Sequence, residues 1–131
     1  MGEFVRVLFV CVGNTCRSQM AEAIAREKGH EAVSAGTDPP KDRGVAENAL
    51  TVLEEVGIET SGLYPKSIDS LESEEFDRII SMGCGVSCPN LPIDKDWGLE
   101  DPQGQGIEIY RKTRDLISKF VSDLVPLSTD A

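Results

Sequence analysis

Aromatic residues are scarce in this chain of 131 residues, which holds 1 tryptophan, 2 tyrosines and 4 phenylalanines. The length fits a single domain over residues 1–131, whose core must therefore be mainly aliphatic. Basic residues are also few, because 13 lysines and arginines stand against 23 acidic residues, for a net charge of -10. An acidic surface repels nucleic acids and anionic membranes, so neither is an expected partner.

Long apolar runs are missing as well. The sequence has no run of 18 or more apolar residues, and its start, Met-Gly-Glu-Phe-Val-Arg, lacks the basic and apolar segments of a signal peptide. We therefore expect a cytoplasmic monomer that does not enter a membrane. Four cysteines in a reducing compartment favour catalytic, redox or metal-binding thiols over structural disulfides. The one histidine, His30, lies between a predicted helix and a predicted strand, and we do not expect it to act as a general base.

Strands and helices alternate along the sequence. Apolar runs predict strands at 5–10, 31–35 and 78–82, and a short fourth strand at 96–99. Apolar residues at helical spacing predict helices at 19–28, 45–56 and 108–125, and a short helix at 70–75 has Ser70 and Ser73 as rival N-caps. This alternation predicts an α/β fold with a parallel sheet covered by helices on both faces.

The most informative segment follows the first predicted strand and reads Cys11-Val-Gly-Asn-Thr-Cys-Arg-Ser18. Backbone N–H groups at the start of the next helix have no intrahelical partner and can bind an anion. Gly13 and Asn14 tolerate the positive φ that a tight anion-binding loop requires. The residues predicted to bind the oxyanion are Val12, Gly13, Asn14, Thr15, Cys16 and Arg17.

Three side chains of this segment are suited to attack a bound oxyanion. The surrounding amides favour the thiolate over the thiol at Cys11, which is the predicted nucleophile. Arg17 offers a planar fork that matches two oxygens of phosphate or arsenate. Ser18 can cap the helix and offer its hydroxyl to the Cys11 sulfur. Cys16 either packs beneath the loop or forms a disulfide with Cys11, and we favour packing.

A second pair of thiols, Cys84 and Cys88, lies in a glycine-rich loop after the third predicted strand. Loops at the carboxyl ends of parallel strands meet at one edge of a sheet, so we expect this loop beside Cys11. Cys84 could attack an adduct on Cys11, and Cys88 could then attack the Cys11–Cys84 disulfide. A structural zinc held by all four cysteines is one alternative, and a non-catalytic thiol sensor is another.

A third cluster, Trp97-Gly-Leu-Glu-Asp-Pro102, follows the fourth predicted strand. Asp101 is the predicted general acid for the oxygen that leaves when Cys11 attacks, and Glu100 is the neighbouring candidate. An Asp-Pro pair is by itself mostly a turn signal. Trp97 is expected in the core or in the wall of a pocket.

Four segments together resemble the thioredoxin-coupled arsenate reductases, which share their fold and anion loop with the low-molecular-weight protein tyrosine phosphatases. These segments are Cys11 to Glu22, Ser34-Ala-Gly-Thr37, Cys84 with Cys88-Pro89, and Trp97 to Pro102. The resemblance implies a four-stranded parallel sheet in 2-1-3-4 order. It also implies that Cys11 attacks arsenate and Asp101 protonates the departing hydroxyl. Cys84 would then displace arsenite, and Cys88 would form a disulfide that thioredoxin reduces.

The chain departs from the better-known reductases in its thiol pair, because Cys84 and Cys88 are more closely spaced and Gly83 is inserted before the first of them. Some members of the family bind a potassium ion beside the loop. The resemblance implies that residues matching Asn14 and Glu22 would contribute to such a site, and no other metal is expected.

A tyrosine phosphatase is the rival interpretation, since it would use Cys11, Arg17 and Asp101 unchanged and pass through a phosphocysteine on Cys11. Phosphatases of that family place tyrosines just after the Asp-Pro pair, whereas this chain has Gln103-Gly-Gln-Gly106. They also have no use for two further thiols, so the sequence favours the reductase with weak phosphatase side activity.

Overall fold

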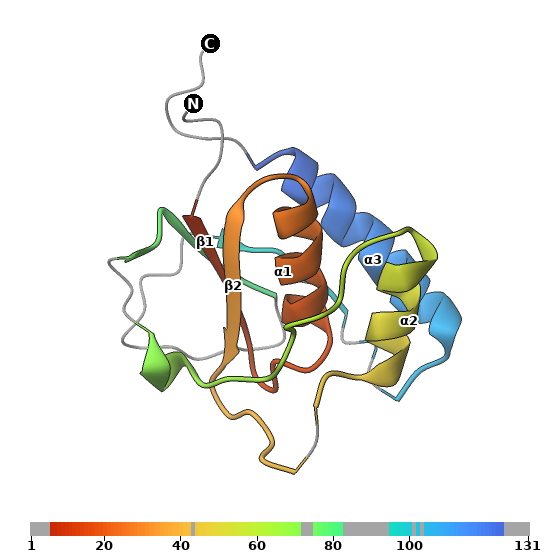
Figure 1. Cartoon of the computed structure of the whole chain (residues 1–131), viewed down its shortest axis with the longest axis horizontal. Helices are drawn as coiled ribbons and strands as arrows, with labels where there is room; N and C mark the ends of the chain where they lie inside the picture. The colour runs from red at the N-terminus through yellow and green to blue at the C-terminus, as the bar shows by residue number, and fades with distance from the viewer. Residues whose placement is uncertain are drawn as a thin grey trace.

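Four parallel strands form the centre of the molecule in a computed structural model (Figure 1), which describes residues 6–42, 44–71, 75–82, 95–100, 102 and 104–124. The strands are β1 (Arg6–Cys11), β2 (Glu31–Gly36), β3 (Arg78–Ser81) and β4 (Lys95–Asp96). The helices are α1 (Arg17–Glu27), α2 (Glu47–Glu55), α3 (Ile107–Ser122) and the short 3-10 helix η1 (Ile68–Ser70). Every strand pair is parallel and the sheet order is β2-β1-β3-β4, which confirms the predicted α/β topology.

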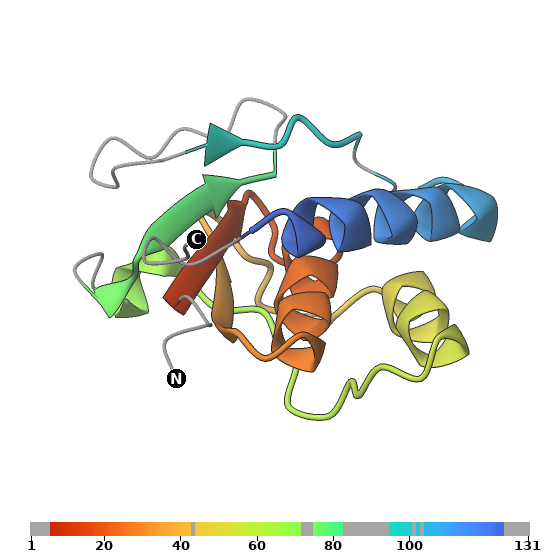
Figure 2. The ribbon, with the colours of Figure 1, turned by 90° about the horizontal axis from the view of Figure 1, so that it is seen from above.

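Different segments cover the two faces of the sheet. Strand β1 is apolar on both sides, with Val7 and Phe9 in one core cluster and Leu8 and Val10 in the other. Helices α1 and α3 cover the first face, and α2 packs against both of them (Figure 2). Among the described residues, Ile68 of η1, Leu71 and Phe76 pack against the second face. No helix in the described ranges has the length and apolar character that crossing a membrane requires.

Residues 72–74 of the helix predicted at 70–75 lie outside the described residues, so this helix stays a prediction. Just before them, η1 begins at Ile68 and is capped by Ser67, whose Oγ accepts a hydrogen bond from the Asp69 N–H at 3.0 Å. Ser70 ends this turn and donates its hydroxyl to the Ser67 carbonyl at 2.8 Å, so it is not an N-cap. Ile68 of this turn packs against the second core cluster. The rival cap Ser73 lies outside the described residues.

The fourth strand is shorter and earlier than predicted, because β4 ends at Asp96. Gly98 has φ of 60°, which interrupts extended backbone. The N–H groups of Trp97 and Leu99 still donate to carbonyls at the end of β3, at 2.9 and 2.8 Å. The other predicted elements are present with ends that differ by a few residues.

Candidate active site

The oxyanion loop, residues 12–16, joins the end of β1 to the first residue of α1. Cys11 is the last residue of β1 and lies opposite Gly36 of β2. Asn14 turns the chain with φ of 56°, the only positive φ at a non-glycine position in the described ranges. Gly13 does not share this conformation, so Asn14 alone supplies the positive φ expected in this loop.

The Cys11 sulfur lies among hydrogen-bond donors. Its Sγ is 2.9 Å from Ser18 Oγ and accepts a hydrogen bond from the Asn14 backbone N–H at 3.1 Å. Ser18 Oγ also accepts a bond from Asn14 Nδ2 at 2.8 Å, so its own hydrogen is available for the sulfur. Contacts of this kind stabilise a thiolate nucleophile. The predicted contact between Ser18 and Cys11 is therefore confirmed.

The predicted capping role of Ser18 is wrong. Helix α1 begins at Arg17, two residues earlier than expected, so Ser18 lies inside the first turn. Cys16 occupies the N-cap position, and its side chain makes no capping hydrogen bond. Cys16 is buried in the first core cluster and no disulfide joins it to Cys11, which confirms the packing interpretation for its thiol.

A buried amide network fixes the orientation of Asn14. Its Oδ1 accepts hydrogen bonds from Gln19 Nε2 at 3.0 Å and from the Lys66 backbone N–H at 2.9 Å, so its Nδ2 must face Ser18. Gln19 Nε2 also donates to the carbonyls of Asn14 and Tyr64, at 2.9 and 2.8 Å. Sequence reasoning missed Gln19 and Lys66. For Gln19, the only signal in the sequence was its place directly after Arg17-Ser18, in the first turn of the helix that follows the loop.

Arg17 connects the oxyanion loop to the ends of two other segments. The residue is buried, with 4% of its surface exposed. Its Nη1 donates to the Leu99 carbonyl at 3.0 Å and lies 3.5 Å from the Met82 carbonyl. Three chain segments thus meet at the carboxyl edge of the sheet, as the parallel topology predicted.

The remaining predicted catalytic residues, Cys84, Cys88 and Asp101, lie outside the described residues. Their roles stay predictions. Glu100, the alternative general acid, is exposed, and its Oε2 accepts a hydrogen bond from Gln105 Nε2 at 3.1 Å.

The end of β2 holds the oxyanion loop from the other side. The N–H groups of Thr37 and Asp38 donate to the carbonyls of Cys11 and Val12, at 3.0 and 2.9 Å. This approach is possible because Gly36 has no side chain, since a Cβ there would lie 2.6 Å from the Val12 carbonyl oxygen. Sequence reasoning treated Gly36 only as the end of a strand. Its presence in the motif Ser-Ala-Gly-Thr was the available signal.

The other predicted anion-binding positions differ in their exposure to solvent. Val12 is 42% exposed, whereas Thr15 is buried and its carbonyl accepts a bond from the Ala46 N–H at 2.8 Å. The described ranges contain no group of three or more histidine, cysteine or acidic side chains arranged to hold a metal ion.

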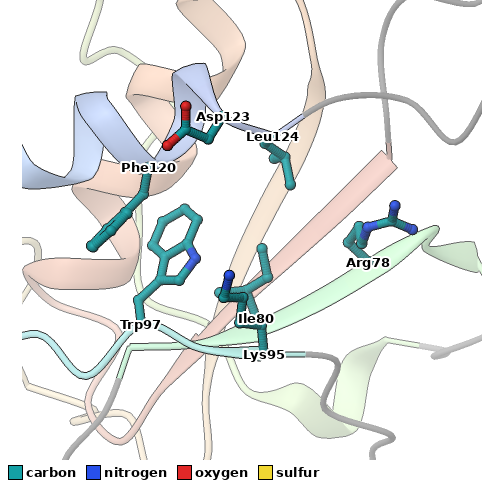
Figure 3. Close-up of a pocket in the computed structure, with 7 residues that line it drawn as sticks. All are labelled: Arg78, Ile80, Lys95, Trp97, Phe120, Asp123 and Leu124. Atoms are coloured by element: carbon teal, nitrogen blue, oxygen red, sulfur yellow. The ribbon is translucent and has the colours of Figure 1, made fainter. Parts of the chain in front are cut away.

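Two other residues considered in the sequence lie away from the loop. His30 precedes β2, at the opposite edge of the sheet, where burial and then the nearby Lys28 charge lower the pKa of its imidazole. Trp97 packs between Phe9 and Phe120, with ring centroids 5.3 and 5.2 Å away and the rings tilted to each other. It also lines a hollow of about 340 Å³ beside α3 (Figure 3), so its predicted place in the core and in a pocket wall is confirmed.

Glu22 is fully buried on α1, one turn after Ser18. Its Oε1 accepts hydrogen bonds from the Ser34 backbone N–H at 2.9 Å and from Ser34 Oγ at 2.6 Å, and Lys66 Nζ lies 3.5 Å away. Its Oε2 forms an ion pair with Arg26 Nη2 at 2.7 Å. Two cationic side chains therefore already neutralise the carboxylate that the resemblance assigned to potassium. These residues do not fit a potassium ion.

Comparison with known proteins identifies the family. Residues 6–129 match the family described as low molecular weight phosphotyrosine protein phosphatase. The chain belongs to this family. The glutaredoxin arsenate reductase of Synechocystis sp. is 37% identical over 125 residues, which cover 92% of this chain and 95% of that protein.

Solved structures of this phosphatase family include both kinds of enzyme. An arsenate reductase in the phosphate binding state has 38% sequence identity and a TM-score of 0.81, over 89% of this chain and 93% of that one. A low molecular weight protein tyrosine phosphatase from T. tengcongensis has 34% identity and a TM-score of 0.76, over 89% of this chain and 95% of that one. Family membership alone therefore does not choose between reduction and hydrolysis.

Proposed function

We propose that this member of the family is an arsenate reductase with a relay of three thiols, Cys11, Cys84 and Cys88. The observation that carries the proposal is the contact of Arg17 with the Met82 and Leu99 carbonyls. This contact joins the oxyanion loop to the end of β3. Cys84 follows Met82 by two residues in the sequence. Two features support it further: the relatives named arsenate reductases, and the phosphate binding state of the similar structure.

The first step makes a sulfur–arsenic bond. The Cys11 thiolate attacks the arsenic of arsenate while Arg17 and the loop amides hold the oxygens. An As–O bond breaks, and Asp101 gives its proton to the departing hydroxide, which leaves as water. Arsenic remains in the +5 state at this point.

The second and third steps transfer two electrons from the thiols. Cys84 attacks the Cys11 sulfur, so that an S–S bond forms and the S–As bond breaks with its electron pair on arsenic, which leaves as arsenite. Cys88 then attacks the Cys84 sulfur and releases the Cys11 thiolate. The product is a Cys84–Cys88 disulfide, which an external dithiol must reduce. We propose thioredoxin as that donor, although the Synechocystis relative is named a glutaredoxin enzyme.

A phosphatase is the second candidate function, because the T. tengcongensis phosphatase has a similar fold and a phosphocysteine would form on the same predicted nucleophile, Cys11, with the same arginine, Arg17. The residues after Asp101-Pro102 count against it, since Gln103-Gly-Gln-Gly106 offers no aromatic ring to stack on a phosphotyrosine. A hydrolase would also leave Cys84 and Cys88 without a chemical role.

The relay is tested by removing its two later thiols separately. In Cys84→Ser and Cys88→Ser, we expect arsenate-dependent NADPH oxidation through thioredoxin and its reductase to fall to background. Cys84→Ser stops at the arsenic adduct on Cys11, and Cys88→Ser stops at a Cys11–Cys84 disulfide, in which the Cys11 sulfur is buried away from the donor. Hydrolysis of an aryl phosphate should stay at the wild-type rate in both variants, which controls for an intact oxyanion loop. A parallel assay with glutathione and glutaredoxin identifies the donor.

Full reductase turnover in Cys84→Ser would contradict the relay. An equal loss of both activities would instead show that the two cysteines are structural.

A further inference from the structure

We propose that Lys66 is a positioning residue of the oxyanion loop, with an ammonium group that serves as the internal counter-cation of buried Glu22. The loop would then need no bound monovalent metal ion to keep its structure. The inference concerns the site of the proposed function, but its test uses no arsenate, so the two can fail separately.

Lys66 contacts three parts of the site at once. Its backbone N–H donates to Asn14 Oδ1 at 2.9 Å, and its carbonyl accepts a bond from the Gly36 N–H at 2.8 Å. Its Nζ lies 3.5 Å from Glu22 Oε1, donates to the Tyr64 carbonyl at 3.1 Å, and lies 4.5 Å from the centre of the Tyr64 ring. One residue therefore connects the oxyanion loop, the end of β2 and the middle of α1.

The burial of Glu22 makes this counter-charge necessary. A carboxylate with 1% of its side chain exposed is strongly unfavourable unless it is paired and hydrogen-bonded. Ser34 supplies two neutral donors to Oε1. The Arg26 side chain that pairs with Oε2 is 48% exposed, whereas the Lys66 side chain is 14% exposed. Lys66 is thus the less solvated of the two cations.

Opposing effects act on the pKa of Lys66, as expected for a partly buried ion pair. Burial lowers the pKa of its ammonium group, and the charge and hydrogen bond of Glu22 act in the opposite direction. The nearby Arg26 charge also lowers the pKa of Lys66, which lies below its ordinary value overall.

The backbone of Lys66 acts on the nucleophile through hydrogen bonds that have already been described. Its N–H helps to fix the Asn14 amide, Asn14 Nδ2 donates to Ser18 Oγ, and Ser18 Oγ lies 2.9 Å from the Cys11 sulfur. Movement of Lys66 away from α1 would loosen the first bond in this series. Lys66 therefore acts on Cys11 through other residues and is not itself catalytic.

The oxygens that a monovalent cation would use here are mostly engaged. Asn14 Oδ1 already accepts two bonds, and Glu22 Oε1 accepts two from Ser34. Glu22 Oε2 and Gln19 Oε1 accept no hydrogen bond, but Arg26 Nη2 lies 2.7 Å from Glu22 Oε2. A metal ion beside Glu22 would also be repelled by Lys66 and Arg26 within a few ångströms. The lysine and the metal ion are therefore alternatives.

The test compares wild type with Lys66→Met and uses Lys112→Met, an exposed lysine on α3, as the matched control for lost charge. Thermal unfolding is measured in KCl and in choline chloride at equal ionic strength. We expect wild type and Lys112→Met to show the same Tm in both salts. Lys66→Met should have a Tm about 5 °C lower in choline chloride, because Glu22 loses a partner, and should recover part of it in KCl. Adding Glu22→Gln to Lys66→Met should abolish this salt effect.

A second readout follows the nucleophile itself. The alkylation rate of Cys11 at neutral pH, measured by mass spectrometry of its peptide, should fall about fivefold in Lys66→Met, the equivalent of one ordinary hydrogen bond. Lys66→Arg, which keeps the charge, should restore most of the rate.

Two results would overturn the proposal. One is a higher Tm of the wild type in KCl than in choline chloride, which would reveal a metal site despite Lys66. The other is a Lys66→Met variant that matches Lys112→Met in both Tm and Cys11 alkylation. The wild-type comparison decides the first point even if Lys66→Met does not fold.

Discussion

Replacing Arg17 by lysine is expected to lower kcat/KM for arsenate by about 10³-fold, at the upper end of the loss for one transition-state donor. Lysine offers a point charge where the reaction needs a planar fork for two oxygens. Its single nitrogen also cannot reproduce the separate guanidinium nitrogens of Arg17, one of which donates to the Leu99 carbonyl at 3.0 Å. The residue is buried, so water cannot replace the missing contact easily.

Steady-state kinetics with arsenate and with an aryl phosphate measure this effect, and Arg111→Lys is the matched control. Arg111 lies on α3 and pairs with Glu55 at 2.7 Å, so its replacement should leave both activities unchanged. A loss of less than tenfold with both substrates in Arg17→Lys would show that Arg17 only supports the fold.

Gly36→Ala should be the next most damaging change, with a loss of about 10²-fold in kcat/KM from displacement of the loop. The added Cβ would lie 2.6 Å from the Val12 carbonyl oxygen and 3.0 Å from Asn14 Cβ, and the first of these contacts is with backbone. The loop must move, and the bonds from Asn14 to the Cys11 sulfur and to Ser18 change with it.

Gly44→Ala is the control for this substitution, because a Cβ at Gly44 meets no atom within 4 Å. Both variants are compared for kcat/KM and for the Cys11 alkylation rate, which reports on the loop without substrate. If Gly36→Ala and Gly44→Ala behave alike, the close approach of β2 does not determine the geometry of the loop.

Residues close together in the sequence were the predictable part of the site. A strand that ends at Cys11 and a helix that begins a few residues later bring Ser18 next to the sulfur, since both ends of a short loop must meet. The strand order followed from the resemblance, and the parallel direction followed from the alternation of strands and helices. These features depend on local pattern, which the sequence displays directly.

Contacts between distant positions were not predictable in the same way. Lys66 reaches Asn14 across 52 positions and Glu22 across 44, and the segment that carries it has no repeating apolar pattern. The potassium role of Glu22 came only from the family resemblance, and no pattern in the sequence indicated which cation lies beside Oε1. Only the folded chain shows that it is Lys66. The role of Gly36 was missed for the same reason. The Val12 carbonyl oxygen, which leaves no room for a side chain at Gly36, belongs to another segment.

A single turnover without any external reductant tests the central claim most directly. Fully reduced protein is mixed with arsenate, and arsenite, free thiols and disulfide-linked peptides are measured. The relay predicts about one arsenite per chain, the loss of about two thiols and a Cys84–Cys88 disulfide, because the protein's own thiols supply the two electrons. Cys11→Ser should release no arsenite. Arsenite no higher than in Cys11→Ser, from wild-type protein that still hydrolyses an aryl phosphate, would contradict the relay and identify the chain as a phosphatase.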